Sequence, residues 1–152
     1  MFSEVQKCER SAQFRMEVEL EQVNNSNNQE LRTLLWNVKK NLRGMMYQNG
    51  SLTAETEGLY YIYCHLHFII ESCCEDAEDL QTILNVNGNA MHNVLSTVTQ
   101  PTDSNSKIYR DQYLSLQLFL NVNDSISIQT SHVSWLNVKF IPDANLFGAF
   151  KL

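Results

Sequence analysis

Basic residues are scarce in this chain of 152 residues, which has 11 lysines and arginines against 17 aspartates and glutamates. The net charge is -6, and the basic side chains are scattered singly along the sequence. No basic stripe is therefore present that could displace counterions from a phosphate backbone. We expect no binding to nucleic acid and none to anionic membrane surfaces.

Long apolar runs are also lacking. No stretch approaches the length of a membrane-spanning helix, and the first residues, MFSEVQK, lack the apolar segment of a signal peptide. The chain is therefore expected to be either cytosolic or a piece of a larger protein. Contact with a membrane would then require an N-terminal anchor that this sequence does not contain.

Cysteine occurs at four positions, too few for a disulfide framework, and the spacing contains no CxxC-type zinc pattern. Cys64 lies in an apolar stretch and is predicted to be a buried thiol. Cys73 and Cys74 lie in an acidic segment that should be an exposed loop, and Cys8 is the available distant partner for either of them. Exposed thiols suit an oxidising compartment only when they are paired.

Three Asn-X-Ser sequons favour the same compartment, because N-glycosylation takes place on secreted and cell-surface proteins. The candidate glycosylation sites are Asn24, Asn49 and Asn123. Together with the cysteines they indicate an extracellular protein.

The stretch from Gly58 to Ile70 is the longest strand-like run, and large side chains occupy both of its faces. The even positions form an apolar face of Tyr60, Ile62, Cys64, Leu66, Phe68 and Ile70. The odd positions form an aromatic, amphipathic face of Leu59, Tyr61, Tyr63, His65, His67 and Ile69. A strand with one solvated face would alternate apolar with small polar or charged residues. We therefore expect one face to line the core and the other to contact a second layer or a second chain.

Short strands and frequent turns characterise the rest of the sequence, and no segment has a capped helical apolar stripe. Strands are predicted at 12–23, 80–86, 90–98, 109–120, 125–130 and 146–152, with tight hairpin turns at 48–50 and 87–89. This pattern predicts an all-β fold, a two-sheet antiparallel sandwich or jelly roll. Residues 1–11 are expected to be an N-terminal tail or stalk remnant, and residues 12–152 the domain.

Several motifs, in this order, resemble the tumour necrosis factor superfamily of cytokine ligands. They are Trp36, Tyr47 with Gly50 to Leu52, the block from Glu57 to Phe68, Tyr113 with Leu114, Asn123 to Ser127, and the terminal Phe147 to Leu152. They span nearly the whole chain. Within the family, the segments around Trp36, Tyr47 and Tyr109 to Ser127 resemble most the lymphocyte ligand whose receptor is the Hodgkin-cell antigen, and Fas ligand next.

The resemblance implies a jelly roll that assembles as a homotrimer and is displayed from a type II membrane protein by a stalk, or shed from it. Such ligands bind cysteine-rich receptor ectodomains of the tumour necrosis factor receptor type in the grooves between protomers and cluster them on immune cells. Family positions matching Tyr61, Tyr63, Tyr113, Leu118 and Leu146 lie at the threefold interface. The candidate trimer interface also includes His65, His67 and Phe150.

The chain departs from the family pattern at three places. The cysteine that often pairs with the position of Cys73 is missing from residues 99–106, so Cys8 pairs with one of the exposed cysteines or the thiols are free. Ser115-Leu116 replaces a glycine pair, and the turn at 87–89 lacks an aromatic residue that relatives present to receptors. The expected receptor contacts are therefore Asn27, Asn28, Arg32, Asn87, Trp135, Lys139, Phe140 and Asp143.

Other functions have weaker support. His65, His67 and Glu71, after Gly58, resemble the first metal motif of cupin-type jelly rolls, but the second motif is missing around His92. No metal site is therefore predicted. No GxSxG elbow occurs either, so the sequence predicts no nucleophilic enzyme, and no motif indicates a cofactor. A complement-type trimeric globular head, acting in recognition or adhesion, is the alternative ligand class.

Two side-chain hypotheses remain open at this stage. Trp135 and Phe140 either anchor a receptor or close the end of the sandwich. His65 and His67, if they lie near a threefold axis, would add like charge when protonated and loosen the trimer below about pH 6.5.

Overall fold

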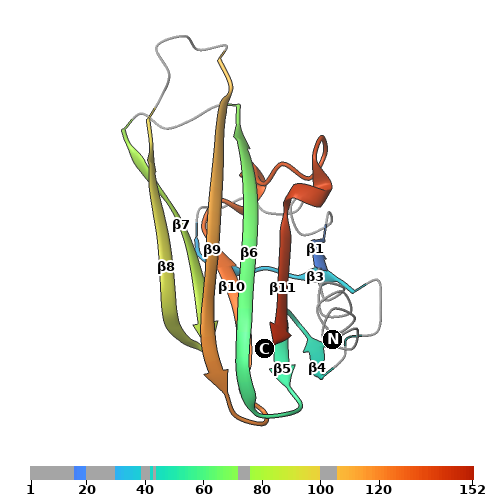
Figure 1. Ribbon diagram of the computed structural model, residues 1–152. Helices are drawn as coiled ribbons and strands as arrows, with labels where there is room; N and C mark the ends of the chain where they lie inside the picture. The colour runs from blue at the N-terminus through green and yellow to red at the C-terminus, as the bar shows by residue number, and fades with distance from the viewer. Residues whose placement is uncertain (1–15, 20–29, 39–41, 43, 72–75, 100–105) are drawn as a thin grey trace.

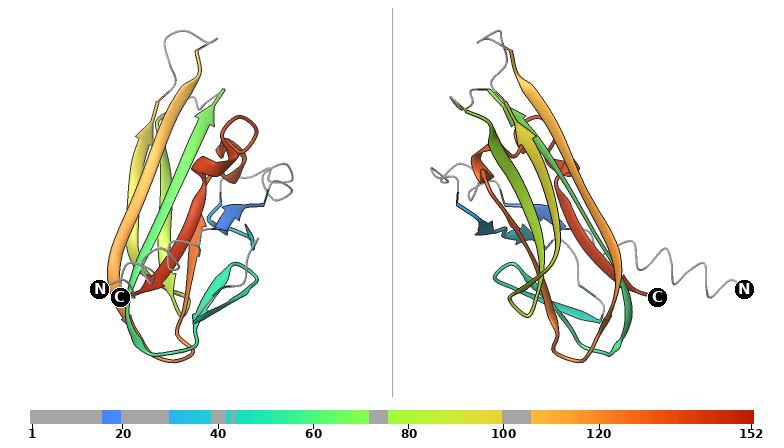
Figure 2. Two further views of the ribbon diagram at one scale, coloured as in Figure 1. Left: turned by 45° about the vertical axis from the view of Figure 1, so that its right-hand side comes forward. Right: turned by 90° about the vertical axis from the view of Figure 1, so that its left-hand side faces the viewer.

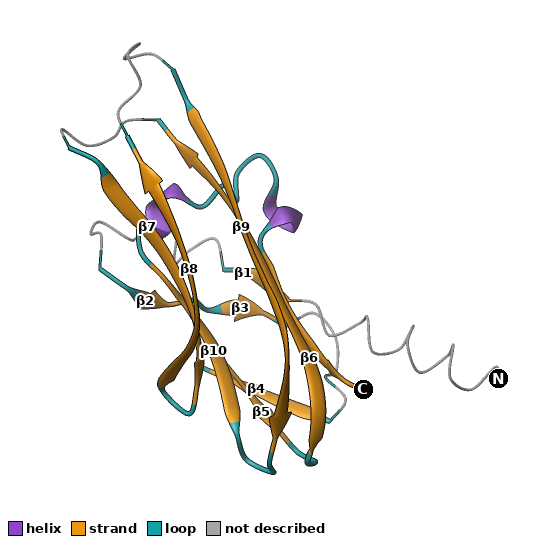
Figure 3. Ribbon diagram, turned by 60° about the vertical axis from the view of Figure 1, so that its left-hand side comes forward, coloured by secondary structure: helices purple, strands orange, loops and turns teal. Residues whose placement is uncertain are grey.

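The computed structural model describes residues 16–19, 30–38, 42, 44–71, 76–99 and 106–152 (Figure 1). The strands are β1 (Met16–Val18), β2 (Arg32–Thr33), β3 (Trp36–Asn37), β4 (Met45–Gln48), β5 (Ser51–Ala54), β6 (Gly58–Ile70), β7 (Glu78–Val86), β8 (Asn89–Val98), β9 (Ile108–Leu120), β10 (Ser125–Thr130) and β11 (Leu146–Lys151). Two short 3-10 helices, η1 (Val133–Trp135) and η2 (Pro142–Ala144), lie between β10 and β11 (Figure 3). The predicted all-β class is confirmed.

Two antiparallel sheets form the layers of a sandwich (Figure 2). The first sheet has the order β3-β1-β11-β6-β9, and the second has the order β4-β5-β10-β7-β8, with β2 paired to β10. The last strand, β11, lies between β1 and β6, so the C-terminal segment is held inside a sheet. No helix in the described residues is long and apolar enough to cross a membrane.

Left-handed turn residues set two of the hairpins. The β4–β5 turn has Asn49 at φ 47° and Gly50 at φ 89°, and the β7–β8 turn has Asn87 at φ 52° and Gly88 at φ 80°. Asparagine and glycine tolerate this region, which matches the twist of paired strands. A Cβ on Gly50 would also lie 2.7 Å from the carbonyl oxygen of Leu34. Both predicted hairpin turns are confirmed.

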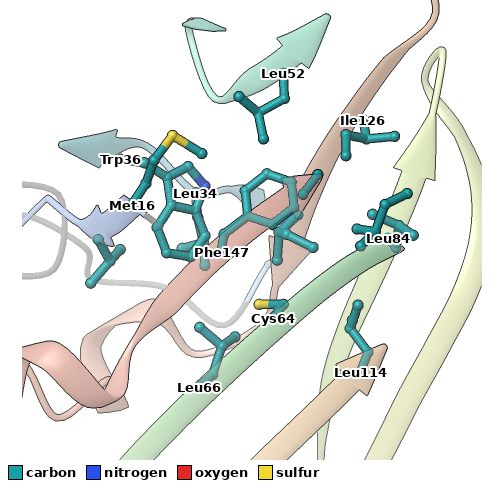
Figure 4. Close-up of a cluster of buried hydrophobic side chains, with 14 of the residues drawn as sticks. Met16, Leu34, Trp36, Leu52, Cys64, Leu66, Leu84, Leu114, Ile126 and Phe147 are labelled. Atoms are coloured by element: carbon teal, nitrogen blue, oxygen red, sulfur yellow. The ribbon is translucent and has the colours of Figure 1, made fainter. Parts of the chain in front are cut away.

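The even face of β6 lines the core, as its period predicted. Its side chains are at most 3 % exposed, and Cys64 and Leu66 point between the sheets together with Leu114 and Phe147 (Figure 4). Burial raises the pKa of the Cys64 thiol far above its usual value, which confirms the predicted buried thiol.

Three residues that carried the family resemblance pack together in this core. The rings of Trp36 and Phe147 lie 5.4 Å apart, and the Trp36 backbone N–H donates to the Tyr47 hydroxyl at 2.7 Å. They join β3, β4 and β11 across the two sheets. The motif residues therefore fix the fold rather than an exposed surface.

A buried polar group also connects the sheets. Gln112 of β9 accepts a hydrogen bond from Thr82 of β7 and donates to the carbonyl oxygen of Leu80 at 2.9 Å. The hydroxyls of Thr82 and Thr130 lie 2.9 Å apart. Buried polar atoms that all find partners specify one alignment of the two layers.

Candidate functional site

The outer face of the first sheet carries aromatic side chains along β11, β6 and β9. Directly opposite residues of an antiparallel pair point to the same side of the sheet. Tyr61 lies opposite Phe150, and His65 lies between Leu146 on β11 and Tyr113 on β9. We call this surface the aromatic face. It includes these predicted interface residues: Tyr61, Tyr63, His65, His67, Tyr113, Leu146 and Phe150.

Rings on the aromatic face contact one another, but several of these side chains remain exposed to solvent in the single protomer. The Tyr61 ring lies 5.3 Å from Phe150 and 6.2 Å from Tyr63, and His65 stacks on Tyr113 at 4.1 Å. Tyr113 is nevertheless 66 % exposed and Phe119 61 % exposed. Tyr113 and Phe119 are therefore accessible to a partner.

Leu118 does not belong to the aromatic face, which corrects the sequence-based placement. It lies opposite Tyr60, whose side chain is in the core, so Leu118 is half-buried on the inner face of β9. The prediction placed Tyr113 and Leu118 on one face although they have opposite parity in a strand. Without the glycine pair of the family, the strand is regular here, and Phe119 takes the outer position.

Three further residues of the aromatic face were missed: Tyr109, Asp111 and Phe119. The odd positions of residues 109–119 would have identified them, because they share the parity of Tyr113. Leu59, which the period of residues 58–70 placed on this face, also lies there, opposite Phe119.

Asp111 links the two histidines of the aromatic face. His65 Nε2 and His67 Nδ1 donate to the same Asp111 oxygen at 2.9 and 2.8 Å. Burial alone would raise the pKa of the Asp111 carboxyl, but the hydrogen bonds from His65 and His67 and their charges lower it overall. The Nε2 atom of His67 is buried without a hydrogen-bond partner in the described residues.

Glu71, the third member of the cupin-like motif, lies elsewhere. Its carboxylate is 3.7 Å from the Lys107 ammonium, and the two histidines bond to Asp111 instead. The described residues contain no group of three or more potential ligands that could hold a metal ion.

Two buried asparagines fix residues 131–145, the connection between β10 and β11, onto β6. The Asn145 side chain accepts the backbone N–H of His67 at 2.7 Å and donates to the carbonyl oxygen of Asn137 at 3.0 Å. The Asn137 N–H donates to the carbonyl oxygen of His67 at 2.8 Å. Both asparagines are at most 2 % exposed. This connection, which we call the β10–β11 loop, is therefore anchored to β6 through Asn137 and Asn145.

Trp135 and Phe140 occupy different environments in that loop. Trp135 is half-buried, packs against the core and stacks on His132 at 4.0 Å. Phe140 is 62 % exposed. The geometry therefore favours an end-closing role for Trp135 and leaves Phe140 available to a partner.

His132 was not identified from the sequence. Its Nε2 lies 2.7 Å from a Glu78 oxygen and its Nδ1 lies 2.9 Å from the Ser131 hydroxyl. Ser131 and His132 are at most 6 % exposed, and the hydroxyl also accepts the Gln81 N–H. This order of partners reverses the Ser–His–acid arrangement of hydrolases, where the serine bonds to Nε2. The group thus supports the loop under Trp135.

The remaining receptor candidates do not gather at one place. Asn87 lies in the β7–β8 turn, where its side-chain N–H donates to the Asp124 carboxylate and its side-chain oxygen accepts the backbone N–H of Ser125. The hydrogen bond from Asn87 is the main cause that lowers the pKa of Asp124. Arg32 lies half-buried in β2, whereas Lys139 and Asp143 are exposed in the β10–β11 loop.

The modification candidates divide between described and undescribed residues. Asn49 and Asn123 are exposed and lie in turns with φ 47° and 72°. The other candidates, Asn24, Asn27, Asn28, Cys8, Cys73 and Cys74, lie outside the described residues, as does the proposed tail of residues 1–11. Glycosylation and disulfide pairing stay predictions.

The described surfaces define a β-sandwich whose distinctive features are an aromatic sheet face and an anchored loop with an exposed phenylalanine. The family model of the tumour necrosis factor (TNF) family matches residues 34–152. The chain belongs to this family. It is 29 % identical over 117 residues to tumor necrosis factor ligand superfamily member 8 from Mus musculus, covering 77 % of this chain. The matched region spans 48 % of that relative, about half its length.

Proposed function

We propose that this TNF-family cytokine ligand acts as a homotrimer that clusters cysteine-rich receptors of the tumour necrosis factor receptor type on immune cells. The aromatic face carries the proposal. Tyr113 and Phe119 are more than 60 % exposed in one protomer, and aromatic side chains are enriched in the buried centres of protein interfaces. A threefold arrangement would bury these rings against a neighbouring protomer.

Trimerisation would supply the signalling mechanism. Closed threefold symmetry creates three equivalent grooves between protomers. A ligand that holds three receptors at fixed spacing gains avidity and brings their intracellular parts together without any chemical step. Under this proposal the domain is extracellular, as the ectodomain of a type II membrane protein or its shed form.

The relative suggests the first receptor to test. Tumor necrosis factor ligand superfamily member 8 is the CD30 ligand, and we propose that this chain binds the same class of receptor. Light scattering of the chain mixed with the CD30 ectodomain should show three receptors on each trimer. The Fas ectodomain serves as the comparison, because Fas ligand is the second resemblance. A chain that forms no complex with either receptor would contradict the receptor assignment.

A further inference from the structure

Phe140 is an exposed aromatic residue on a loop that is anchored to β6. Its ring is 62 % exposed, and the next side chain, Ile141, is 42 % exposed. The Phe140 backbone N–H donates to the Asn137 side chain at 3.3 Å, and Asn137 itself is bonded to β6. A backbone held in place in this way loses little conformational entropy when a partner covers its side chain.

Two lysines from separate segments lie over the Phe140 ring. The Lys139 ammonium is 5.6 Å from the ring centroid, and the Lys107 ammonium, just before β9, is 5.9 Å from it. The structure describes only one other lysine, Lys151. The concentration of two cations at one aromatic ring is therefore unusual for a chain of net charge -6.

Glu71, the acidic neighbour of Lys107, forms only a weak ion pair with it. Glu71 lies 3.7 Å from Lys107, and these side chains are 67 % and 46 % exposed. Exposed ion pairs contribute little to stability. A carboxylate on a partner could therefore replace Glu71 beside Lys107 with little loss.

A partner that covers the ring must also accommodate both ammonium groups. Burying an unpaired charge is costly, so an apolar pocket without acidic groups would be rejected. We infer that Phe140 inserts into an apolar receptor pocket whose rim carries carboxylates that pair with Lys139 and Lys107. This inference rests on the proposed receptor-binding function and assigns the chemistry of one contact.

Binding of the wild-type trimer to immobilised CD30 ectodomain provides the test. Phe140→Ala should raise the dissociation constant by more than about tenfold, as expected for an interface hot spot. The matched control is Val122→Ala, which truncates a side chain that is 52 % exposed in the β9–β10 turn. This control should bind like the wild type.

The carboxylate rim is tested separately at Lys139. Lys139→Glu should weaken binding by about threefold to tenfold, with a smaller effect at high salt, and Lys139→Arg should retain binding. Circular dichroism and native mass should be unchanged in all these variants, because the altered side chains are exposed.

The possible failures point to different conclusions. If the wild type binds CD30 and Phe140→Ala binds equally well, the inference is wrong and the proposed function stands. If Phe140→Ala weakens binding but Lys139→Glu does not, the pocket has no acidic rim. The inferred pairing of receptor carboxylates with the lysines is then wrong. A wild type that does not bind CD30 would overturn the receptor assignment together with the inference.

Discussion

The outer positions of β10 on the second sheet differ from those of β6 and β9 on the first. On the second sheet, β10 places Ile126 and Ile128 in the core and Ser125, Ser127 and Gln129 outside. This is the alternation of a sheet with one solvated face. On the first sheet, the corresponding outer positions of β6 and β9 carry tyrosine, histidine and phenylalanine. The aromatic side chains are thus confined to the first sheet, whereas the outer positions of the second sheet combine polar residues with the exposed Met46 and Leu95.

The aromatic character is limited to three neighbouring strands. On β1, which pairs with β11, the outer position is Glu17, opposite Leu146. The aromatic face therefore has a polar boundary, as interaction surfaces do. Substitutions on this face, in the core and on the outer face of the second sheet should therefore have different effects.

The largest effect is expected from two phenylalanines of β11. Phe147 is fully buried beside Trp36, whereas Phe150 lies on the aromatic face. Phe147→Ala should lower the free energy of unfolding by about 3–5 kcal/mol because it leaves a cavity, and Phe150→Ala should lower it much less. Urea denaturation of both variants at one protomer concentration measures the difference. Equal losses would contradict the assignment of the two faces.

Assembly should respond to charge on the aromatic face alone. Phe119→Glu places an unpaired carboxylate where the threefold contact is proposed, and the trimer should dissociate at least about a hundredfold more readily. Thr53→Glu, on the outer face of the second sheet, is the matched control and should remain trimeric. Sedimentation velocity compares them. If both variants associate like the wild type, the aromatic face is not the contact.

The histidine–aspartate group should make assembly depend modestly on pH. Protonating His65 and His67 would place positive charge on side chains that are only 22 % and 12 % exposed, whereas the Asp111 carboxylate is 45 % exposed and better solvated. The rings of Tyr113 and Tyr109 stack on His65 and His67. The trimer should therefore loosen as pH falls below about 6.5.

Asp111→Asn sharpens this prediction. Without the carboxylate, protonation adds positive charge that nothing in the group offsets, so the variant trimer should loosen more than the wild type between pH 7.5 and pH 5. Sedimentation at both values measures it. A wild-type trimer that is unchanged between the two pH values would refute the histidine hypothesis. If the wild type and Asp111→Asn loosen equally, Asp111 does not offset the charge of the histidines.

The smallest effect concerns the stability of the protomer in acid. The pKa of Asp111 is lowered in the folded state, so its contribution is present above the unfolded pKa of about 3.9 and is lost as pH falls through the folded pKa. Because this side chain is 45 % exposed, the contribution should stay below about 1 kcal/mol. Denaturation at pH 6 and pH 3 should show a slightly smaller loss for Asp111→Asn. If Asp111→Asn loses as much stability between pH 6 and pH 3 as the wild type, other carboxylates cause the acid effect.

Local patterns were sufficient for the fold but not for every surface. The period of residues 58–70 predicted both faces of β6, and Asn-Gly signals predicted the hairpins, because these features depend on neighbouring residues. Leu118 was misplaced because its position came from the family, whereas the regular strand of this chain, with Ser115-Leu116 in place of a glycine pair, turns Leu118 to the inner face. The pairs His132–Glu78 and His67–Asn145 join residues 54 and 78 positions apart, so no local pattern could reveal them.

The mass of the protein in solution tests the central claim most directly. Sedimentation equilibrium of the wild-type chain at pH 7.5 should give three times the protomer mass of 17.6 kDa, and Phe119→Glu should shift the mass towards that of one protomer. A wild-type protein that sediments as a single 17.6 kDa chain at micromolar concentration would contradict the account.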